Sequence, residues 1–395
     1  MELKKYKLRE LIEIKNGKEH KHLMEGEYPV YGSGGIMRYV NEYIYNEPSV
    51  LLPRKGTLNN IQYSNTPFWT VDTLYYTKVK TNIVNPYYLY RYLKLLDLSN
   101  LDTGTGVPSM TFDSYYNIEV LLPSIEEQNK KSKILQLLDE KIELNRKIND
   151  NLEAMAKQLY DYWFVQFDFP NEEGKPYKSS GGKMVWNEKL KREIPDRWEI
   201  KKLKEVLQHI NTGLNPRDNF VFGGNIKYIT VKNLTTNNYI DFSKCDTIDK
   251  EAHKKVHKRS RISSGDILYA SICPLGRTYL ITEEPIDWDI NESVFSIRPN
   301  HNEITSEYLN MLLKDEYYIA TLSNSSTGSI FLGIRIKQLE ETHILLPQKD
   351  IQNIFSQKIK NIIQLQVNHF KQIESLTKQR DELLPLLMNG QVSVN

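Results

Sequence analysis

The chain has 395 residues, which is long enough for two or three domains rather than one ordinary core. Charged residues make up 26% of it, yet the net charge is only +2, so any contact with nucleic acid must come from local basic loops or basic partners. Its two cysteines form no Cys-x-x-Cys motif, which argues against a disulfide framework or a cysteine zinc module. The sequence shows neither a signal-peptide core nor the roughly 20 apolar residues of a membrane helix, so we expect a soluble, cytoplasmic protein.

Several motifs of the first half return in the second. The stretch LRELIEIKNG at 8–17 returns as LKEVLQHINTG at 203–213, and IEVLLPSIEEQ at 118–128 returns as THILLPQKDIQ at 342–352. Each copy of the second motif opens a long run with helical periodicity. A tandem repeat of this size indicates pseudo-twofold symmetry, which suits a symmetric or bipartite target such as DNA.

Residues 1–124 are predicted to form short strands and turns, interrupted by one helix. Strands are expected at 49–52 and 73–76, where β-favouring residues gather between glycines and prolines. The helix follows Asn85 and Pro86, which suit an N-cap and a first helical turn, and its counterpart lies at 305–313. The repeat therefore covers the whole globular domain. We predict an α+β fold with two similar mixed α/β domains and a pseudo-twofold internal repeat.

Two long helices are predicted to join these domains as an antiparallel coiled coil, with two ordinary core helices as the alternative. In the first helix, Lys141 and Asn145 are expected to be polar positions of the seam. Its apolar stripe consists of Ile134, Leu138, Ile148, Leu152, Met155, Leu159 and Tyr162. The stripe of the second helix consists of Ile359, Ile362, Ile363, Phe370, Ile373, Leu376, Leu383, Leu384 and Leu387.

The polar, turn-rich stretch at 170–183 is expected to belong to a linker that is long enough for the second half to turn round. The two long helices could then pack antiparallel. The predicted organisation has five parts: a first domain at 1–124, a central long helix at 125–166, a linker at 167–195, a second domain at 196–347 and a C-terminal long helix at 348–395.

The stretch NLEAMAKQLYDYWFVQFDFP at 151–170 resembles the end of the central helical region in specificity subunits of type I restriction-modification systems. Further similar stretches are PFWTVDTL at 67–74, GDIL at 265–268 and RDELLPLLMNG at 380–390. The resemblance spans nearly the full chain, including the order of the domains. It implies a non-catalytic DNA reader in which each target-recognition domain reads one half of a bipartite, asymmetric sequence and the helices set the spacer between the halves.

The resemblance also implies partners. Two methyltransferase subunits would dock on the helices to form an adenine N6 methylase, and restriction and translocase subunits would join them. S-adenosylmethionine and ATP are expected only on those partners, so we expect no cofactor on this chain. The residues at 160–165 and 383–387 are candidates for the docking surface, although they could equally close the helix pair.

The two halves differ in length. Matching landmarks lie 195 residues apart at Leu8 and Leu203 but 224 apart at Gln128 and Gln352. The two readers should therefore have different loops and prefer different half-sites.

Loops with Gly, Ser, Thr, Arg and Asn can bring side chains to base edges and backbone amides to phosphates. In the first domain the candidate DNA contacts are Tyr31, Ser33, Gly34, Arg54, Lys55, Thr57, Thr105 and Ser109. In the second domain they are Arg217, Lys232, Asn233, Ser271, Arg277, Ser326, Thr327 and Ser329. The basic run at 254–259 could bind phosphates. Ordinary surface turns and solvated charges are the alternatives.

Two histidines, His253 and His257, stand four residues apart and could face one metal ion on a helix. No third ligand is evident in the sequence. We therefore predict no metal site.

Two other classes of protein remain as alternatives. A self-contained DNA methyltransferase or endonuclease is disfavoured, because NPYY at 85–88 has one proline and is better explained as a helix start. The glycines at 32–35 precede no doubly wound pattern, and the sequence has no P-loop. A solitary coiled-coil DNA-binding protein or scaffold decoy without a methylase partner is the other alternative, which sequence-selective DNA binding would distinguish from a reader.

Overall fold

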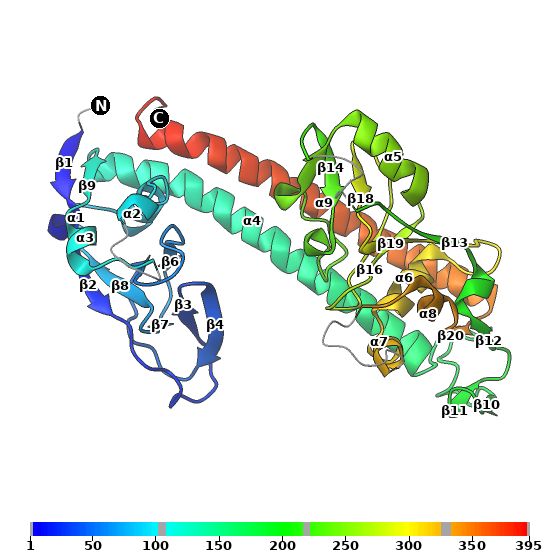
Figure 1. Ribbon diagram of the computed structural model, residues 1–395. Helices are drawn as coiled ribbons and strands as arrows, with labels where there is room; N and C mark the ends of the chain where they lie inside the picture. Colours follow the sequence, from blue (N-terminus) through cyan, green and yellow to red (C-terminus); the bar gives the residue numbers. More distant parts are fainter. Residues whose placement is uncertain (1–2, 102–107, 216–221, 325–332, 393–395) are drawn as a thin grey trace. The chain divides into compact units, whose positions relative to one another are not determined.

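The computed structural model describes residues 3–101, 108–215, 222–324 and 333–392 (Figure 1). The chain forms two compact units. Unit 1 consists of residues 1–144 and 372–395, and unit 2 consists of residues 145–371. The long helices α4 (Ile125–Tyr160) and α9 (Lys349–Met388) each contribute residues to both units. Within the described ranges, every helix is too short or too polar to cross a membrane.

Unit 1 contains a four-stranded and a three-stranded sheet. The first has the order β2 (Ile12–Asn16), β8 (Leu74–Val79), β5 (Ser49–Pro53), β6 (Gln62–Ser64). The second has the order β4 (Gly35–Val40), β3 (Tyr28–Gly32), β7 (Trp69–Thr70), with β3 and β7 parallel. In addition, β1 (Lys4–Lys7) pairs with β9 (Glu119–Leu122). The helices of this globular part are α1 (Leu8–Leu11), α2 (Pro86–Leu93), η1 (Ser99–Leu101) and α3 (Phe112–Tyr116).

Unit 2 repeats this topology. Its four-stranded sheet has the order β13 (Leu207–Thr212), β19 (Val294–Pro299), β16 (Ile267–Ala270), β17 (Thr278–Leu280). Its three-stranded sheet has the order β15 (Asp246–Ile248), β14 (Ile226–Ile229), β18 (Trp288–Ile290), with β14 and β18 parallel. The pair β12 (Glu199–Lys202) and β20 (His343–Leu346) corresponds to β1 and β9. The predicted α+β fold with two similar domains is confirmed.

The helices of unit 2 also follow the repeat, with several additions. The counterparts of α1, α2 and α3 are η3 (Leu203–Val206), α6 (Ser306–Lys314) and α8 (Ile336–Glu340). The short η4 (Val231–Asn233), η5 (Phe242–Lys244) and α7 (Glu316–Asn324) complete the set. Between β15 and β16 lies α5 (Lys250–Ser260), whereas residues 41–48 join β4 to β5 without a helix. Residues 249–266 are ten more than residues 41–48, which is about a third of the extra length of the second half, and the connection from β14 to β15 at 230–245 adds a larger share.

The N-cap expected for α2 is confirmed, and the structure shows a similar cap on its counterpart α6. The side chain of Asn85 accepts a hydrogen bond from the amide of Tyr88 at 2.9 Å, and Pro86 occupies the first turn. The side chain of Thr305 accepts one from the amide of Tyr308 at 3.4 Å. Each cap satisfies an amide that the helix itself leaves unpaired.

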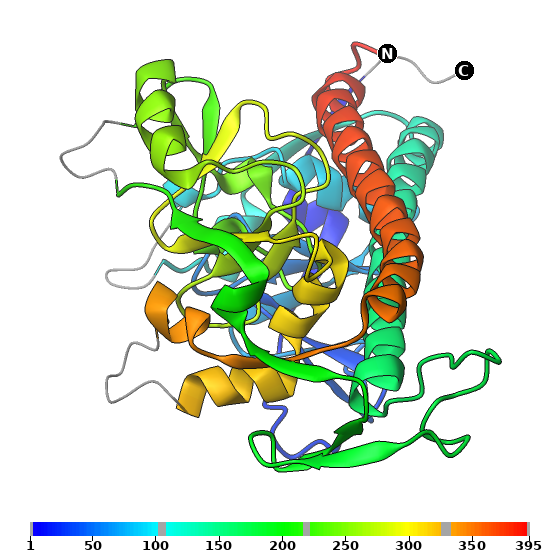
Figure 2. The same cartoon turned by 90° about the vertical axis from the view of Figure 1, so that its right-hand side faces the viewer.

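In each unit, α4 and α9 lie side by side and run antiparallel (Figures 1 and 2). In unit 1, Lys131 Nζ donates to the carbonyl of Leu387 at 2.7 Å, and Arg380 Nη1 lies 3.0 Å from Asp139 Oδ1. As the residue number rises along α4, the number of the bonded residue on α9 falls, so the two helices run antiparallel. The same order holds in unit 2, where Asn145 Oδ1 lies 3.0 Å from a ring nitrogen of His369 and Asn149 donates to the carbonyl of Gln366 at 3.4 Å.

The seam of α4 differs from the predicted apolar stripe, whereas the stripe predicted for α9 lies at buried or half-buried positions. The buried positions of α4 include Leu135, Ile142, Asn145, Asn149 and Ala156. Met155, which we expected in the seam, is 56% exposed, and Lys141 is exposed as well. Five of the seven apolar residues of the predicted stripe in α4 lie one residue before a buried position, because their spacing does not specify which of two adjacent rows faces the partner helix. Asn145 was correctly expected to be a polar seam position.

A buried glutamine anchors each long helix to its own globular part. Gln128 donates through Nε2 to the carbonyls of Ile83 and Pro123 at 3.1 and 3.0 Å, and its Oε1 accepts from the amide of Asn85. Gln352 makes the same set of bonds in unit 2, with the carbonyls of Glu303 and Pro347 and the amide of Thr305. These bonds connect the start of the long helix to the cap of α2 or α6.

The end of α4 is closed by aromatic packing inside unit 2. Tyr160 is the last residue of α4, and the π-helical turn η2 (Asp161–Val165) follows it. Tyr160, Trp163 and Phe164 are buried in the main core of unit 2, where they contact Phe355. Leu384 and Leu387 are buried in unit 1. These buried residues close the helix pair, as the alternative expected, whereas Tyr162, Val165 and Leu386 are exposed. The expectation of a docking surface stays a prediction.

The stretch expected to be a linker contains structure of its own. It holds the hairpin of β10 (Met184–Asn187) and β11 (Arg192–Pro195), and Phe167, Phe169 and Ile194 join the core of unit 2. The two units divide inside the long helices, after residues 144 and 371. The five-part division of the chain stays a prediction.

We expect Gln352→Leu to lower the free energy of unfolding by about 1–3 kcal/mol, because it leaves a buried amide and two carbonyls without their partner. Urea denaturation would measure the loss, and hydrogen exchange of α6 would locate it in unit 2. Gln357→Leu, at an exposed position of the same helix, is the matched control. Equal stability of the two variants would show that the anchor has no energetic role.

Candidate nucleic-acid interface

The structure brings the candidate loops of unit 1 together. Asn60 Nδ2 donates to the carbonyl of Ser33 at 2.6 Å, which ties the β3–β4 turn to the loop after β5. In that loop, Lys55 forms an isolated bridge with Ser109, and the amide of Gly56 donates to the carbonyl of Pro108 at 2.9 Å. Three segments that are far apart in the sequence thus form one surface, which carries Tyr31, Ser33, Gly34, Arg54, Lys55, Thr57 and Ser109.

These residues differ in how far they reach the solvent. Gly34, Lys55 and Thr57 are exposed, whereas Ser33, Ser109, Tyr31 and Arg54 are partly buried. The ring of Tyr31 packs edge-on against Phe68, and burial raises the pKa of its hydroxyl. Arg54 Nη1 lies 3.3 Å from the carbonyl of Asp72. The exposed members are the best placed of the set to reach a partner.

The sequence analysis missed three neighbours of this surface. Ile36, Met37 and Tyr39 of the edge strand β4 are 49%, 60% and 51% exposed, and they directly follow the glycine turn. Exposed apolar side chains beside a polar loop commonly mark a binding surface. Their position immediately after the predicted loop was the signal that could have found them.

In unit 2, the structure joins two of the candidate residues. Arg277 Nη1 lies 3.4 Å from the carbonyl of Val231, so the guanidinium sits beside η4, which carries the exposed Lys232. Arg277 Nε has no hydrogen-bond partner among the described residues. Arg277 and Lys232 therefore lie on neighbouring segments of unit 2.

The structure does not support base contacts by Asn233 and Ser271. Asn233 is buried, and its side chain accepts from Thr230 and donates to the carbonyl of Asp241. Ser271 is also buried, and its hydroxyl donates to the carbonyl of Ser293 at 2.7 Å. Both side chains serve the fold, because their polar groups already have partners inside the protein.

Arg54 and Ser271 occupy equivalent positions in the two units. The amide of Arg54 donates to the carbonyl of Thr73, just before β8, and the carbonyl of Arg54 accepts from the amide of Met110, two residues before α3. In the same way, the amide of Ser271 donates to Ser293, just before β19, and its carbonyl accepts from Ile334, two residues before α8. Lys55 and Ile272 follow them, and each forms the equivalent isolated bridge. The same loop therefore presents a lysine in unit 1 and an exposed isoleucine in unit 2. Thr105, Arg217, Ser326, Thr327 and Ser329 lie outside the described residues.

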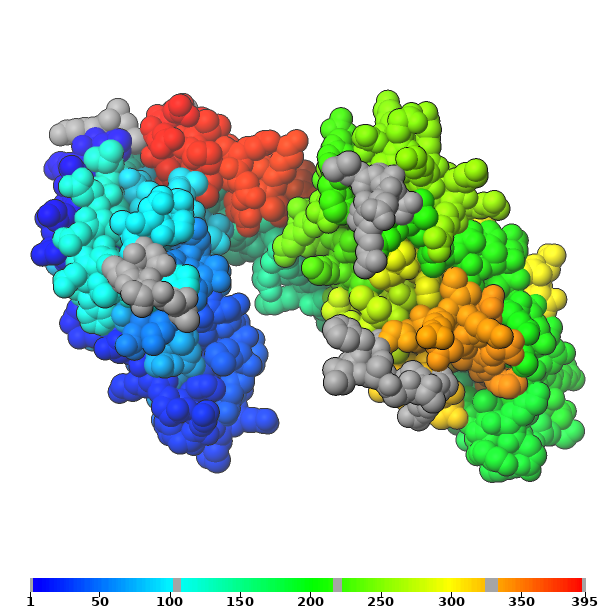
Figure 3. All heavy atoms as spheres, in the orientation of Figure 1, coloured from blue at the N-terminus to red at the C-terminus, as the bar shows by residue number. Residues whose placement is uncertain are grey.

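Helix α5 of unit 2 carries a cationic face. Asp249 caps its first turn, and Ala252, Val256 and Ser260 form its buried side. The exposed cations are Lys250, Lys254, Lys255, Lys258 and Arg259. Figure 3 shows this helix at the surface of unit 2. The predicted basic run is thus largely an exposed helical face, suited to phosphate contacts.

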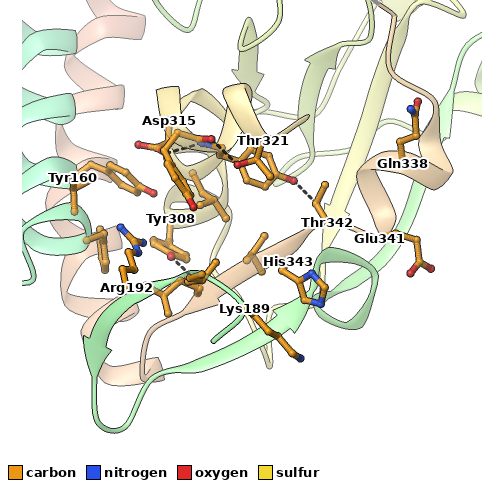
Figure 4. Close-up of a pocket in the computed structure, with 18 residues that line it drawn as sticks. Tyr160, Lys189, Arg192, Tyr308, Asp315, Thr321, Gln338, Glu341, Thr342 and His343 are labelled. Atoms are coloured by element: carbon orange, nitrogen blue, oxygen red, sulfur yellow. Dashed lines mark hydrogen bonds between the residues drawn. The ribbon is translucent and has the colours of Figure 1, made fainter. Parts of the chain in front are cut away.

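A pocket of about 540 Å³ lies elsewhere in unit 2, near the end of α4. Figure 4 shows Tyr160, Arg192 and Tyr308 gathered on one side of it. Asp315 accepts a hydrogen bond from the amide of Tyr318 at 2.9 Å, and burial raises the pKa of its carboxyl group. None of the described candidate DNA contacts lines this pocket, so it is separate from the proposed nucleic-acid interface.

One group of side chains in the described part of the chain has the spacing of metal ligands. It consists of His253 and His257 on α5 and Asp289 on β18. The sequence analysis missed Asp289 because it lies on a strand more than 30 residues after His257.

Comparison with known proteins agrees with this architecture. The family model of the type I restriction modification DNA specificity domain matches residues 1–154 and 195–378. The type I restriction enzyme MjaIX specificity subunit of Methanocaldococcus jannaschii is 27% identical over 368 residues, which cover 89% of this chain and 79% of that protein. The HindI specificity subunit of Haemophilus influenzae is 26% identical over 371 residues, which cover 79% and 78%. The crystal structure of a type I S subunit from M. genitalium has a TM-score of 0.57 at 16% identity and covers 98% of this chain and 96% of that one.

Proposed function

We propose that this chain, which belongs to the family of type I restriction-modification DNA specificity subunits, reads a bipartite, asymmetric DNA sequence with one half-site for each globular part. A specificity subunit recognises DNA and is not itself an enzyme, so the chain is not a self-contained methyltransferase or endonuclease. The observation that carries the proposal is the repeated topology, which places the same loop in both units.

Differences between the two loops support an asymmetric target. Unit 1 offers Arg54 and Lys55, which can donate to guanine, whereas the equivalent loop of unit 2 offers the exposed, apolar Ile272. Unit 2 instead has the pair of Lys232 and Arg277. The cationic face of α5 has no counterpart between β4 and β5, and we assign it to phosphate contacts.

The chain acts together with DNA and other restriction-modification subunits. We propose that two methyltransferase subunits bind the long helices, that restriction and translocase subunits complete the complex in the cytoplasm, and that S-adenosylmethionine and ATP bind to those partners. In unit 1, Leu137 and Leu144 of α4 are more than half exposed and stand one heptad apart on one side of the helix. We place a methyltransferase contact there.

Substitutions in the loops of one unit should alter the recognition of one half-site and leave the other unchanged. Arg54→Ala with Lys55→Ala should relax one half-site, and Lys232→Ala with Arg277→Ala should relax the other, because a bidentate hydrogen-bond pair to a base contributes about 1–3 kcal/mol of discrimination. Mapping methylated adenines after co-expression with the methyltransferase would show this, with the exposed Lys80→Ala as control. If either pair of substitutions altered both half-sites, separate reading by the two units would be refuted.

The cationic face of α5 should act without regard to sequence. Lys258→Ala with Arg259→Ala should weaken binding to all duplexes alike and reduce the slope of log affinity against log salt by about 0.9 for each phosphate that is no longer neutralised. Fluorescence anisotropy of the methyltransferase complex at several salt concentrations would measure the slope. Lys244→Ala, an exposed lysine of the same unit, is the control. A changed target sequence with an unchanged slope would argue against phosphate contacts.

The helix pair should set the spacer. Seven residues inserted into α4 between Asp139 and Asn145, and seven into α9 between His369 and Arg380, would keep the antiparallel register that the hydrogen bonds define. They add about 10 Å of helix, or roughly three base pairs, so the mapped half-sites should move apart by that amount. An equal insertion at 178–182 is the control. A methylating complex with the original spacing would show that the helices are not the ruler.

A further inference from the structure

Three ligating side chains from two elements meet on one side of unit 2. His253 and His257 lie one helical turn apart on α5, which packs against β18, where Asp289 is located. His253 Nε2 lies 3.4 Å from Asp289 Oδ2, and His257 Nδ1 lies 3.1 Å from the same oxygen. All three ligating atoms lie within 4.8 Å of one another.

These distances suit a small divalent cation. Zinc binds imidazole nitrogen and carboxylate oxygen at about 2.0–2.2 Å in a tetrahedron, whose edges are then about 3.3 Å long. The two distances from the histidine nitrogens to Asp289 Oδ2 are close to that edge length. Two histidines at i and i+4 on a helix, completed by a carboxylate from another element, form a ligand set that zinc prefers.

The burial of the group also favours a cation. Asp289 is fully buried, and its other oxygen already accepts the amide of Ile290 at 2.8 Å. Both histidines are partly exposed, so an ion could reach them from solvent.

We propose that His253, His257 and Asp289 bind one divalent transition-metal ion, of which zinc is the best match, and that this ion fastens α5 to β18. Three protein ligands leave the fourth position for water. The ion would fix the cationic helix that unit 2 has gained by insertion, because few buried side chains of α5 otherwise attach it. The site rests on these three residues alone and does not depend on the proposed DNA contacts.

The test uses the full chain without a histidine tag. Titration with Co²⁺ should give the visible absorption of a tetrahedral site at one equivalent, and competition with Zn²⁺ should abolish it. His253→Gln and His257→Gln should each weaken binding by at least about ten-fold, since even an indirect partner of a ligand contributes about that much. His343→Gln, at an exposed histidine of the same unit, should leave binding unchanged.

Amide hydrogen exchange would show which part of the chain zinc binding stabilises. Zinc should slow amide exchange in α5 of the wild-type chain but not in the double variant His253→Gln, His257→Gln. The proposal is overturned if the wild-type chain binds zinc no more tightly than this double variant, or if zinc leaves exchange in α5 unchanged. The three residues would then be an ion-pair network. Since the histidines are partly exposed, their variants test the site even if Asp289→Asn does not fold.

Discussion

The buried glutamine at the start of each long helix is the contact on which the two halves of this protein depend. In both units its amide pairs with two backbone carbonyls and with the amide of the residue that caps α2 or α6. An amide side chain suits this position because it donates and accepts at once. The globular part and the long helix are thereby joined by bonds that are shielded from water, and the same set recurs in both copies.

The neighbouring helix position shows how one scaffold accepts different packing. Lys131 of unit 1 and Phe355 of unit 2 stand in equivalent places, three residues after the glutamine, and both are fully buried. Phe355 packs against Trp163 and Phe164 at the end of α4. Lys131 donates to the carbonyl of Leu387 near the end of α9, where the helix dipole favours a positive charge, although burial lowers the pKa of its amine. The end of α4 in unit 2 is thus packed by an aromatic contact, and the equivalent end of α9 in unit 1 is capped by a charged hydrogen-bond donor.

In the recognition loops, too, the backbone conformation is the same in both units while the side chains differ. Backbone hydrogen bonds hold Arg54 and Ser271 in equivalent places, so the frame of the loop does not depend on the side chains at its tip. Lys55 and Ile272 can therefore differ without disturbing the fold. This separation explains how two similar units can present different chemistry to DNA.

The sequence by itself determined the repeat, the capped helix α2 and its counterpart α6, the α+β class and the two long helices, because caps and periodicity are local properties of the chain. Only the tertiary structure decided which side chains are buried. It assigned Asn233 to the interior, gave the helix seam its polar residues and brought Asp289 to His253 and His257. These outcomes depend on pairing between strands and helices that are distant in sequence, and no local pattern specifies that pairing.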